Sequence, residues 1–295
     1  MANETIQWYK RKWQTLLKIV IASYAFGFVA ALLVAAEIAV IGGISLFSGN
    51  LMAGIVAGIM AAIIDIVLFG SIGSWFAAAT IVVLRDNRET FGLGQAMRRS
   101  KRYAFPLFWV MILAGLAIFW GWIFFIIPGI VFTIWFLFSR YCVVIDNEKG
   151  VAAISKSREY ARGYFWKIFL LGLLGTITIF IVYGILDAIA RLPLGNLLYI
   201  AATVAIAPIP AIYLYLIFDH LKKIKGGSPM PVSKPQKTLV SSLAAVGLIV
   251  AIALAGLLVY FAPQIKNLYE TARQQYQTQT GKQLPDFPQN PQGPI

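Results

Sequence analysis

Three carboxylic residues interrupt apolar stretches of the chain, where an acidic side chain is rare and often functional. They are Glu37, Asp65 and Asp187, and Arg191 follows Asp187 at a spacing that places both on one helix face. From helical rise, each lies roughly 28–30 Å from the inner end of its apolar stretch. The sequence therefore predicts an acidic cluster near the outer membrane surface, which binds a cation, an amine headgroup or protons. In the alternative interpretation, each carboxylate is hydrated at the boundary or belongs to a structural salt bridge.

Two basic segments form the second set of candidate residues. Residues 86–102 and 147–164 each combine an apolar stripe at helical spacing with Lys and Arg side chains elsewhere on the helix. Such segments bind anionic lipid headgroups or an acidic partner at a membrane surface, but they also serve purely as topology determinants. Both interpretations stay open. The candidate lipid contacts are Arg98, Arg99, Lys101, Arg102, Lys156, Arg158 and Arg162.

The two basic segments belong to a residue pattern that occurs twice. Each occurrence is an apolar span ending in Asp-Asn, a basic linker, and a further apolar span that opens near Phe-Trp. We name them the first copy (about 70–127) and the second copy (about 130–190). Offsets of 60 and then 57 positions relate Trp75 to Trp135, Asp86 to Asp146, Ser100 to Ser157 and Tyr103 to Tyr160.

The elements that carry these residues are predicted to be membrane helices. The chain is 59% hydrophobic and 13% charged, with a mean hydropathy of +0.76. A soluble domain could not cover so much apolar surface, and several runs exceed the ~18 apolar residues of a transmembrane helix. Alternating strand patterns are missing, which argues against a β-barrel. The sequence predicts an all-α, polytopic membrane protein with about seven transmembrane helices.

Composition along the chain divides it into five parts. Pro128-Gly129 is expected to turn the chain between spans, and Pro208 and Pro210 to kink the sixth span. Most of the 25 Lys and Arg residues lie in the segments expected on one side, so the positive-inside rule places the N-terminus in the cytoplasm and the C-terminus outside. The parts are a basic interfacial arm (1–17), a six-span domain (18–218), a basic linker (219–238), an additional span (239–262) and a polar, largely disordered tail (263–295).

Several functional classes are disfavoured. The formal net charge is +13, but the basic residues cluster beside spans, which indicates lipid contact and topology and not nucleic-acid binding. One histidine (His220) and one cysteine (Cys142) cannot furnish a multi-His or multi-Cys metal site. No phosphate-binding Gly-rich loop ending in Gly-Lys-Ser/Thr occurs. We therefore predict no catalytic residue, metal or cofactor.

Three motifs resemble a known bacterial family. They are Ile127-Pro128-Gly129-Ile130, the run Ala153 to Ser157, and Gly163-Tyr164-Phe165-Trp166. Together with the spans around them, they resemble a multipass membrane family that includes the membrane domain fused to glycerophosphoryl diester phosphodiesterases and its stand-alone relatives. The resemblance covers roughly residues 15–225 and implies a bacterial inner-membrane location. It implies no activity, because the histidine and carboxylate motifs of the phosphodiesterase domain have no counterpart here.

The leading functional hypothesis is a non-catalytic bacterial inner-membrane protein that organises lipids, especially those with anionic headgroups, or membrane partner proteins. The alternative is a transporter or permease for a small cation, an amine or a lipid, in which Glu37, Asp65 and Asp187 line a polar pathway. Helical phase discriminates between the two, because a transporter needs these carboxylates to converge on one cavity.

Overall fold

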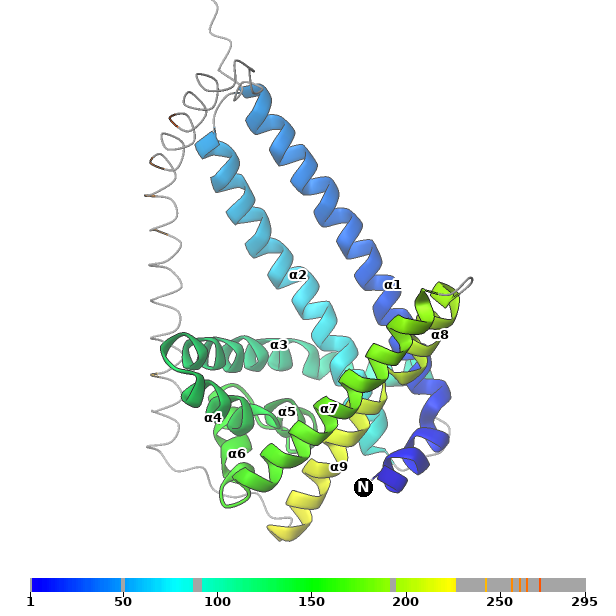
Figure 1. Cartoon of the computed structure of the whole chain (residues 1–295). Coiled ribbons are helices and arrows are strands. Elements are labelled where there is room, and N and C mark those ends of the chain that lie inside the picture. Colours follow the sequence, from blue (N-terminus) through cyan, green and yellow to red (C-terminus); the bar gives the residue numbers. More distant parts are fainter. Residues whose placement is uncertain are drawn as a thin grey trace, which may run out of the picture. The chain divides into compact units, whose positions relative to one another are not determined.

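The computed structural model describes residues 2–48, 51–86, 92–191 and 195–226, together with the isolated positions 242, 256, 260, 264 and 271. Within these residues every regular element is a helix and none is a strand (Figure 1), which confirms the all-α prediction. The helices are α1 (Ala2–Ser48), α2 (Leu51–Arg85), α3 (Leu93–Phe124), α4 (Ile126–Phe136), α5 (Ser139–Ile145), α6 (Val151–Ala161), α7 (Phe165–Ala190), α8 (Gly195–Ile206) and α9 (Ile209–Ile224).

Among the described residues, six helical segments are long and apolar enough to cross a membrane. The protein thus has the helices of a multi-pass membrane protein. The predicted seventh span (239–262), the tail (263–295) and most of the basic linker (219–238) lie outside the continuous described ranges. The six segments are Glu4–Gly43, Val56–Arg85, Leu93–Ile123, Ile126–Ile145, Phe165–Ala190 and Gly195–Ile224.

The chain divides into two compact units, and both α1 and α2 contribute to each. The first unit consists of Met1–Phe26 and Gly70–Gly247, and the second consists of Gly27–Phe69 and Leu248–Ile295. All the basic candidate residues belong to the first unit, whereas Glu37 and Asp65 belong to the second.

The aromatic part of the first unit's core surrounds the short helix α5. Tyr141 and Phe138 are fully buried, and the Tyr141 ring stacks on Phe218 of α9 with 5.5 Å between ring centroids. Phe218 also meets Tyr160 of α6 edge-on at 5.1 Å. Large aromatic surfaces buried in this way favour a fixed arrangement of three helices. They hold α9 against the second copy.

The first seventeen residues, which we predicted to be a basic interfacial arm, are continuous with the following span in α1. They form the beginning of α1, and Thr5, Lys12 and Leu16 are buried in the first unit. The Trp8 ring meets Tyr215 of α9 edge-on at 5.7 Å. A basic segment with aromatic side chains suits either a protein surface or a membrane interface, and the sequence alone does not distinguish the two.

The basic linkers of the two copies have different backbones. In the first copy the linker is continuous with the following span, because α3 runs unbroken from Leu93 through Pro106. In the second copy the linker is the separate helix α6, and the chain turns at Gly163 with φ +84° before α7 begins. Gly163 aligns with Pro106 at the 57-residue offset. Proline fixes φ near the helical value, whereas glycine permits the left-handed conformation that ends a helix.

The turn between the third and fourth spans lies at Phe125 and not at Pro128-Gly129 as predicted. Phe125 has extended backbone angles, and Pro128 occupies the first turn of α4, where its missing N–H costs no helical hydrogen bond. Gly129 is needed for packing instead. A Cβ atom there would lie 2.8 Å from the Trp122 ring, so α3 and α4 approach closely at this point.

The fourth and sixth candidate spans are both interrupted. The sixth breaks between α8 and α9 at Pro208, which confirms the predicted kink. The fourth breaks between α4 and α5, where Ser157 of the linker helix forms hydrogen bonds with backbone groups that the break leaves without a helical partner. Its hydroxyl donates to the Trp135 carbonyl at 2.7 Å and accepts from the Phe138 N–H at 3.1 Å.

Candidate anion-binding pocket

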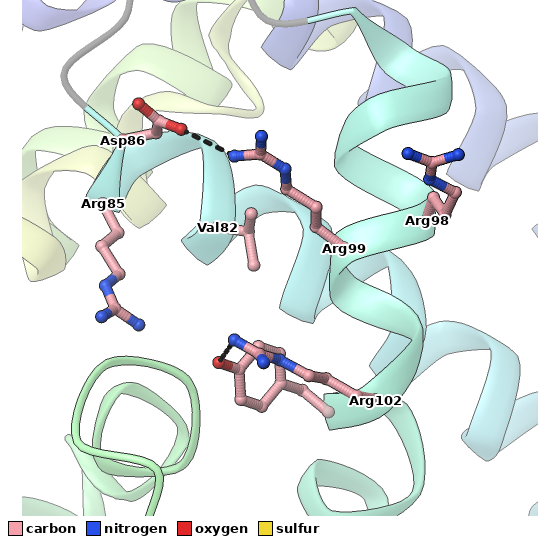
Figure 2. A pocket seen from close by; sticks show the side chains of 7 residues that line it. Val82, Arg85, Asp86, Arg98, Arg99 and Arg102 are labelled. Atoms are coloured by element: carbon pink, nitrogen blue, oxygen red, sulfur yellow. Dashed lines mark hydrogen bonds and ion pairs between the residues drawn. The ribbon is translucent and has the colours of Figure 1, made fainter.

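Arginine side chains of the first copy surround an open cavity at the start of α3. Arg98, Arg99 and Arg102 are spaced to project from neighbouring positions of one helical turn, and Arg85 reaches in from the last turn of α2. The cavity has a volume of about 650 Å³ (Figure 2). We call it the basic pocket; it is lined by Val82, Arg85, Asp86, Arg98, Arg99, Arg102 and Tyr103.

The wall of the basic pocket that α2 supplies is fixed by two distant side chains. The Lys12 ammonium donates to the Val83 carbonyl at 2.6 Å and also to the Asp86 carbonyl. A cation at the C-terminus of a helix satisfies carbonyl groups that lack helical partners and is favoured by the helix dipole. The Trp75 indole N–H donates to the Met97 carbonyl of α3 at 2.8 Å. These bonds hold the end of α2 against the beginning of α3.

Three of the four arginines are anchored by hydrogen bonds. Arg85 Nη1 donates to the Val144 carbonyl at 3.0 Å, and Arg99 Nη1 donates to Asp86 Oδ2 at 3.2 Å. Arg102 Nη2 donates to the Tyr103 hydroxyl at 2.6 Å. The pocket therefore contains four guanidinium groups and one carboxylate, a net charge of about +3 from its lining residues.

The corresponding residues of the second copy form a buried ion-pair cluster. Asp146 Oδ2 lies 3.3 Å from the Lys156 ammonium, and Asp146 Oδ1 lies 2.5 Å from the Lys222 ammonium of α9. The Asp146 and Lys156 side chains are only 6% and 3% exposed. Two carboxylates and two ammonium groups balance in charge here. The cluster consists of Asp146, Glu148, Lys156, Tyr160 and Lys222.

Two further contacts join the cluster to its surroundings. The Tyr160 hydroxyl donates to Asp146 Oδ2 at 3.0 Å, and burial together with the nearby Asp146 carboxylate raises the pKa of that phenol. The Lys225 ammonium donates to the Glu159 carbonyl and, at 2.9 Å, to the Arg162 carbonyl at the end of α6. Burial lowers the pKa of Lys225 from its ordinary value. The charges of the second linker are therefore used largely within the protein.

This arrangement removes one residue from the predicted lipid contacts. Lys156 is 2% exposed and paired with Asp146 and Glu148, so a headgroup at the membrane surface cannot reach its ammonium group. The burial follows from α9, which covers the second linker with Phe218 and supplies Lys222. Arg98, Arg99 and Arg102 do line one pocket, while Lys101 is exposed outside it.

Arg158 and Arg162 lie together at a second cavity of about 530 Å³. The Arg158 guanidinium is 4.2 Å from the centroid of the Trp135 ring, a cation–π distance. Arg162 Nη1 lies 3.8 Å from Glu159 Oε2. Each arginine here already has a partner within the second copy, in contrast to the surplus of positive charge in the basic pocket.

The carboxylates of the predicted acidic cluster belong to different units. Glu37 and Asp65 both belong to the second unit, where their side chains lie near each other. Asp187 pairs with Arg191 at 3.1 Å, as their spacing indicated, and both side chains are largely exposed. One cluster of all three carboxylates stays a prediction. Within the described ranges, no group of three or more His, Cys, Asp or Glu side chains has the geometry of a metal site.

Sequence reasoning missed the residues that complete each site from a distance. Arg85 was not among the candidates. Its position directly before Asp86, at the start of the first basic segment, is a signal that could have identified it. Lys12 and Lys222 carry no such signal, because 71 positions separate Lys12 from Val83 and 76 separate Lys222 from Asp146. Only folding brings them together.

Comparisons of the chain with protein-family models, with characterised proteins and with solved structures find no match. The resemblance to the phosphodiesterase-linked membrane family therefore stays a prediction.

Proposed function

We propose that this chain is a non-catalytic, multi-pass protein of the bacterial inner membrane that binds anionic lipid headgroups and thereby organises lipids around itself. The observation that carries the proposal is the basic pocket, with four arginines and one carboxylate around an open cavity. Arginine donates hydrogen bonds in a planar fork that matches phosphate oxygens, and juxtamembrane basic residues attract anionic lipids.

The predicted topology agrees with this role. With the N-terminus in the cytoplasm, the first linker faces the cytoplasmic leaflet, whose anionic lipids give it a negative surface potential. α3 continues from the linker into an apolar span, so a lipid whose phosphate entered the pocket could lay its acyl chains along the same helix.

The test is retention of anionic lipid by the purified full chain in native mass spectrometry. The double variant Arg98→Gln/Arg102→Gln removes two charges from the basic pocket. Lys101→Gln/Lys149→Gln removes two exposed charges outside it and is the matched control. We expect the first variant to lose bound phosphatidylglycerol by about tenfold and the control to retain it. Equal losses would show that only net charge matters and would contradict a site.

The alternative of cation or proton transport is favoured by one observation, the proximity of the Glu37 and Asp65 carboxyl groups in an otherwise apolar pair of helices. Acidic side chains that lie together in an apolar membrane segment occur in proton and cation pathways. Flux of protons or small cations into proteoliposomes, abolished by Glu37→Gln/Asp65→Asn, would support transport. Absence of flux in the wild-type protein would leave lipid binding as the function.

A further inference from the structure

The basic pocket contains more positive charge than one phosphodiester headgroup can balance. Asp86 pairs with Arg99 at 3.2 Å, and one carboxylate among four arginines leaves the lining with an excess of positive charge. A phosphodiester carries one negative charge, whereas a terminal phosphate carries about −1.5 to −2 at pH 7 and three acceptor oxygens. A dianion therefore fits the surplus better than a monoanion.

Two of these arginines are held in place before any ligand arrives. Figure 2 shows Arg85 extending from α2 and Arg102 from α3 toward the same opening. Arg85 is fixed by the Val144 carbonyl, and Arg102 by the Tyr103 hydroxyl, which in turn donates to Asn147 Oδ1 at 2.8 Å. Each guanidinium carries five N–H donors, so one anchoring bond sets its plane and leaves most donors for a ligand.

The second copy differs from the first in the charges that its linker carries. At the 57-residue offset, Ser155 and Glu159 stand where the first copy has Arg98 and Arg102. The second copy consequently accepts a further cation, Lys222, and closes. In the first copy the cation from a distant element, Lys12, bonds the Val83 and Asp86 carbonyls, and the lining of the basic pocket stays net positive. The complementary occupant of this positively charged lining is an anion.

We propose that the basic pocket selects a terminal phosphate, a phosphomonoester carrying two negative charges, over a phosphodiester. This inference rests on the proposed function and specifies its ligand class. The dianionic phosphate accepts hydrogen bonds from Arg85 and Arg102 on opposite sides, with Arg98 adding charge. Tyr103 acts as a positioning residue, since it orients Arg102 and carries the contact to Asn147.

The experiment compares three probes on the full chain by native mass spectrometry: dioleoyl phosphatidate, dioleoyl phosphatidylglycerol and inorganic phosphate. At pH 7.5 we expect phosphatidate to be retained about tenfold better than phosphatidylglycerol. The preference should shrink toward pH 5.5, because the second phosphate pKa lies near 6 and protonation leaves a monoanion. Arg85→Gln/Arg102→Gln should abolish it.

Tyr103→Phe tests for a built site. It keeps every charge but removes the anchor of Arg102, and we expect a loss of phosphatidate affinity of about fivefold. If only net charge attracted the lipid, Tyr103→Phe would leave the phosphatidate affinity unchanged. Unaltered reactivity of the buried thiol of Cys142 would show that this variant is folded.

The outcomes separate the inference from the proposed function. Equal, arginine-dependent retention of both lipids would overturn the terminal-phosphate selectivity and leave anionic lipid binding intact. Retention of neither lipid would overturn both. Displacement of phosphatidate by millimolar inorganic phosphate would identify phosphate alone as the recognised group. Persistence of phosphatidate against that competitor would assign the site to the lipid.

Discussion

The two copies share a pattern of residues, but the first copy forms an open basic pocket and the second forms a buried ion-pair cluster. In both, an aspartate at the end of an apolar helix pairs with a base of the following linker, at 3.2 Å for Asp86 and Arg99 and at 3.3 Å for Asp146 and Lys156. The first pair is open, with the Arg99 side chain 50% exposed. The second is sealed, with both side chains at 6% exposure or less.

The difference comes from a third element. α9 covers the second copy and contributes Lys222 and Phe218, whereas the first copy has extra arginines and stays open. One pattern can thus become either a joint between helices or a binding pocket, according to what packs against it. The contact from Tyr103 to Asn147 links the two, since a side chain of the first copy ends on the loop of the second.

Removing the aspartate of each copy should break this comparison most strongly. Asp146→Asn leaves Lys156 and Lys222 close together with only Glu148 to compensate, so we expect a loss of about 3 kcal/mol in the free energy of unfolding. Asp86→Asn affects an exposed pair and should cost at most about 1 kcal/mol. Cys142 is the chain's one cysteine and is fully buried, so its reaction with a thiol-specific fluorophore reports unfolding.

A similar loss in both aspartate variants would contradict the distinction between a sealed and an open pair. Greater loss in Asp86→Asn would mean that the first copy bears more of the stability than its exposure indicates.

The two linker serines should differ next. Ser157→Ala removes a buried hydroxyl that bonds both Trp135 and Phe138 across the break between α4 and α5, and we expect a loss of about 2 kcal/mol. Ser100 donates to the Met97 carbonyl within its own helix, so Ser100→Ala should change stability by about 0.5 kcal/mol or less. Thermal unfolding in detergent, followed at Cys142, measures both. If Ser157→Ala left stability unchanged, another group would have to form hydrogen bonds with the Trp135 carbonyl and the Phe138 N–H.

The residues that align at the two linker ends offer a smaller contrast. Gly163 has φ +84°, so Gly163→Ala should cost about 1 kcal/mol in the free energy of unfolding. Pro106 lies within α3, and Pro106→Ala should be neutral or stabilising because the helix regains an N–H donor. The same unfolding assay applies. Destabilisation by Pro106→Ala would contradict this contrast, because it would show that the proline stabilises the end of the first linker as Gly163 stabilises the end of the second.

The weakest expected effect is a pH dependence of stability at Tyr160 of the second copy. The raised pKa of Tyr160 means that folding favours its neutral form. Its contribution to stability is complete below the unfolded tyrosine pKa of about 10 and declines as the pH rises above that value. Tyr160→Phe should therefore reduce the loss of stability between about pH 10 and 11. An unchanged alkaline slope in this variant would assign the dependence to other groups.

The sequence by itself determined the class of the protein and most of its helices. Long apolar runs cannot be covered in a soluble domain, and in a membrane they must satisfy their backbone hydrogen bonds as helices. The break at Pro208 followed from the missing N–H of proline. The spacing of Asp187 and Arg191 likewise predicted their ion pair. The sequence also predicted Arg98, Arg99, Lys101 and Arg102 as one basic group, but it did not show that Lys101 lies outside the pocket that the three arginines line.

Only the tertiary structure decided which basic residues are available to a ligand. Lys156 and Arg99 align in sequence, yet one is buried and the other lines a pocket, since burial depends on α9 reaching the second copy across 76 positions of chain. The same holds for Lys12, which folds back onto the end of α2. Helical periodicity fixes neighbours within a turn, but it contains no information about which distant helix covers them.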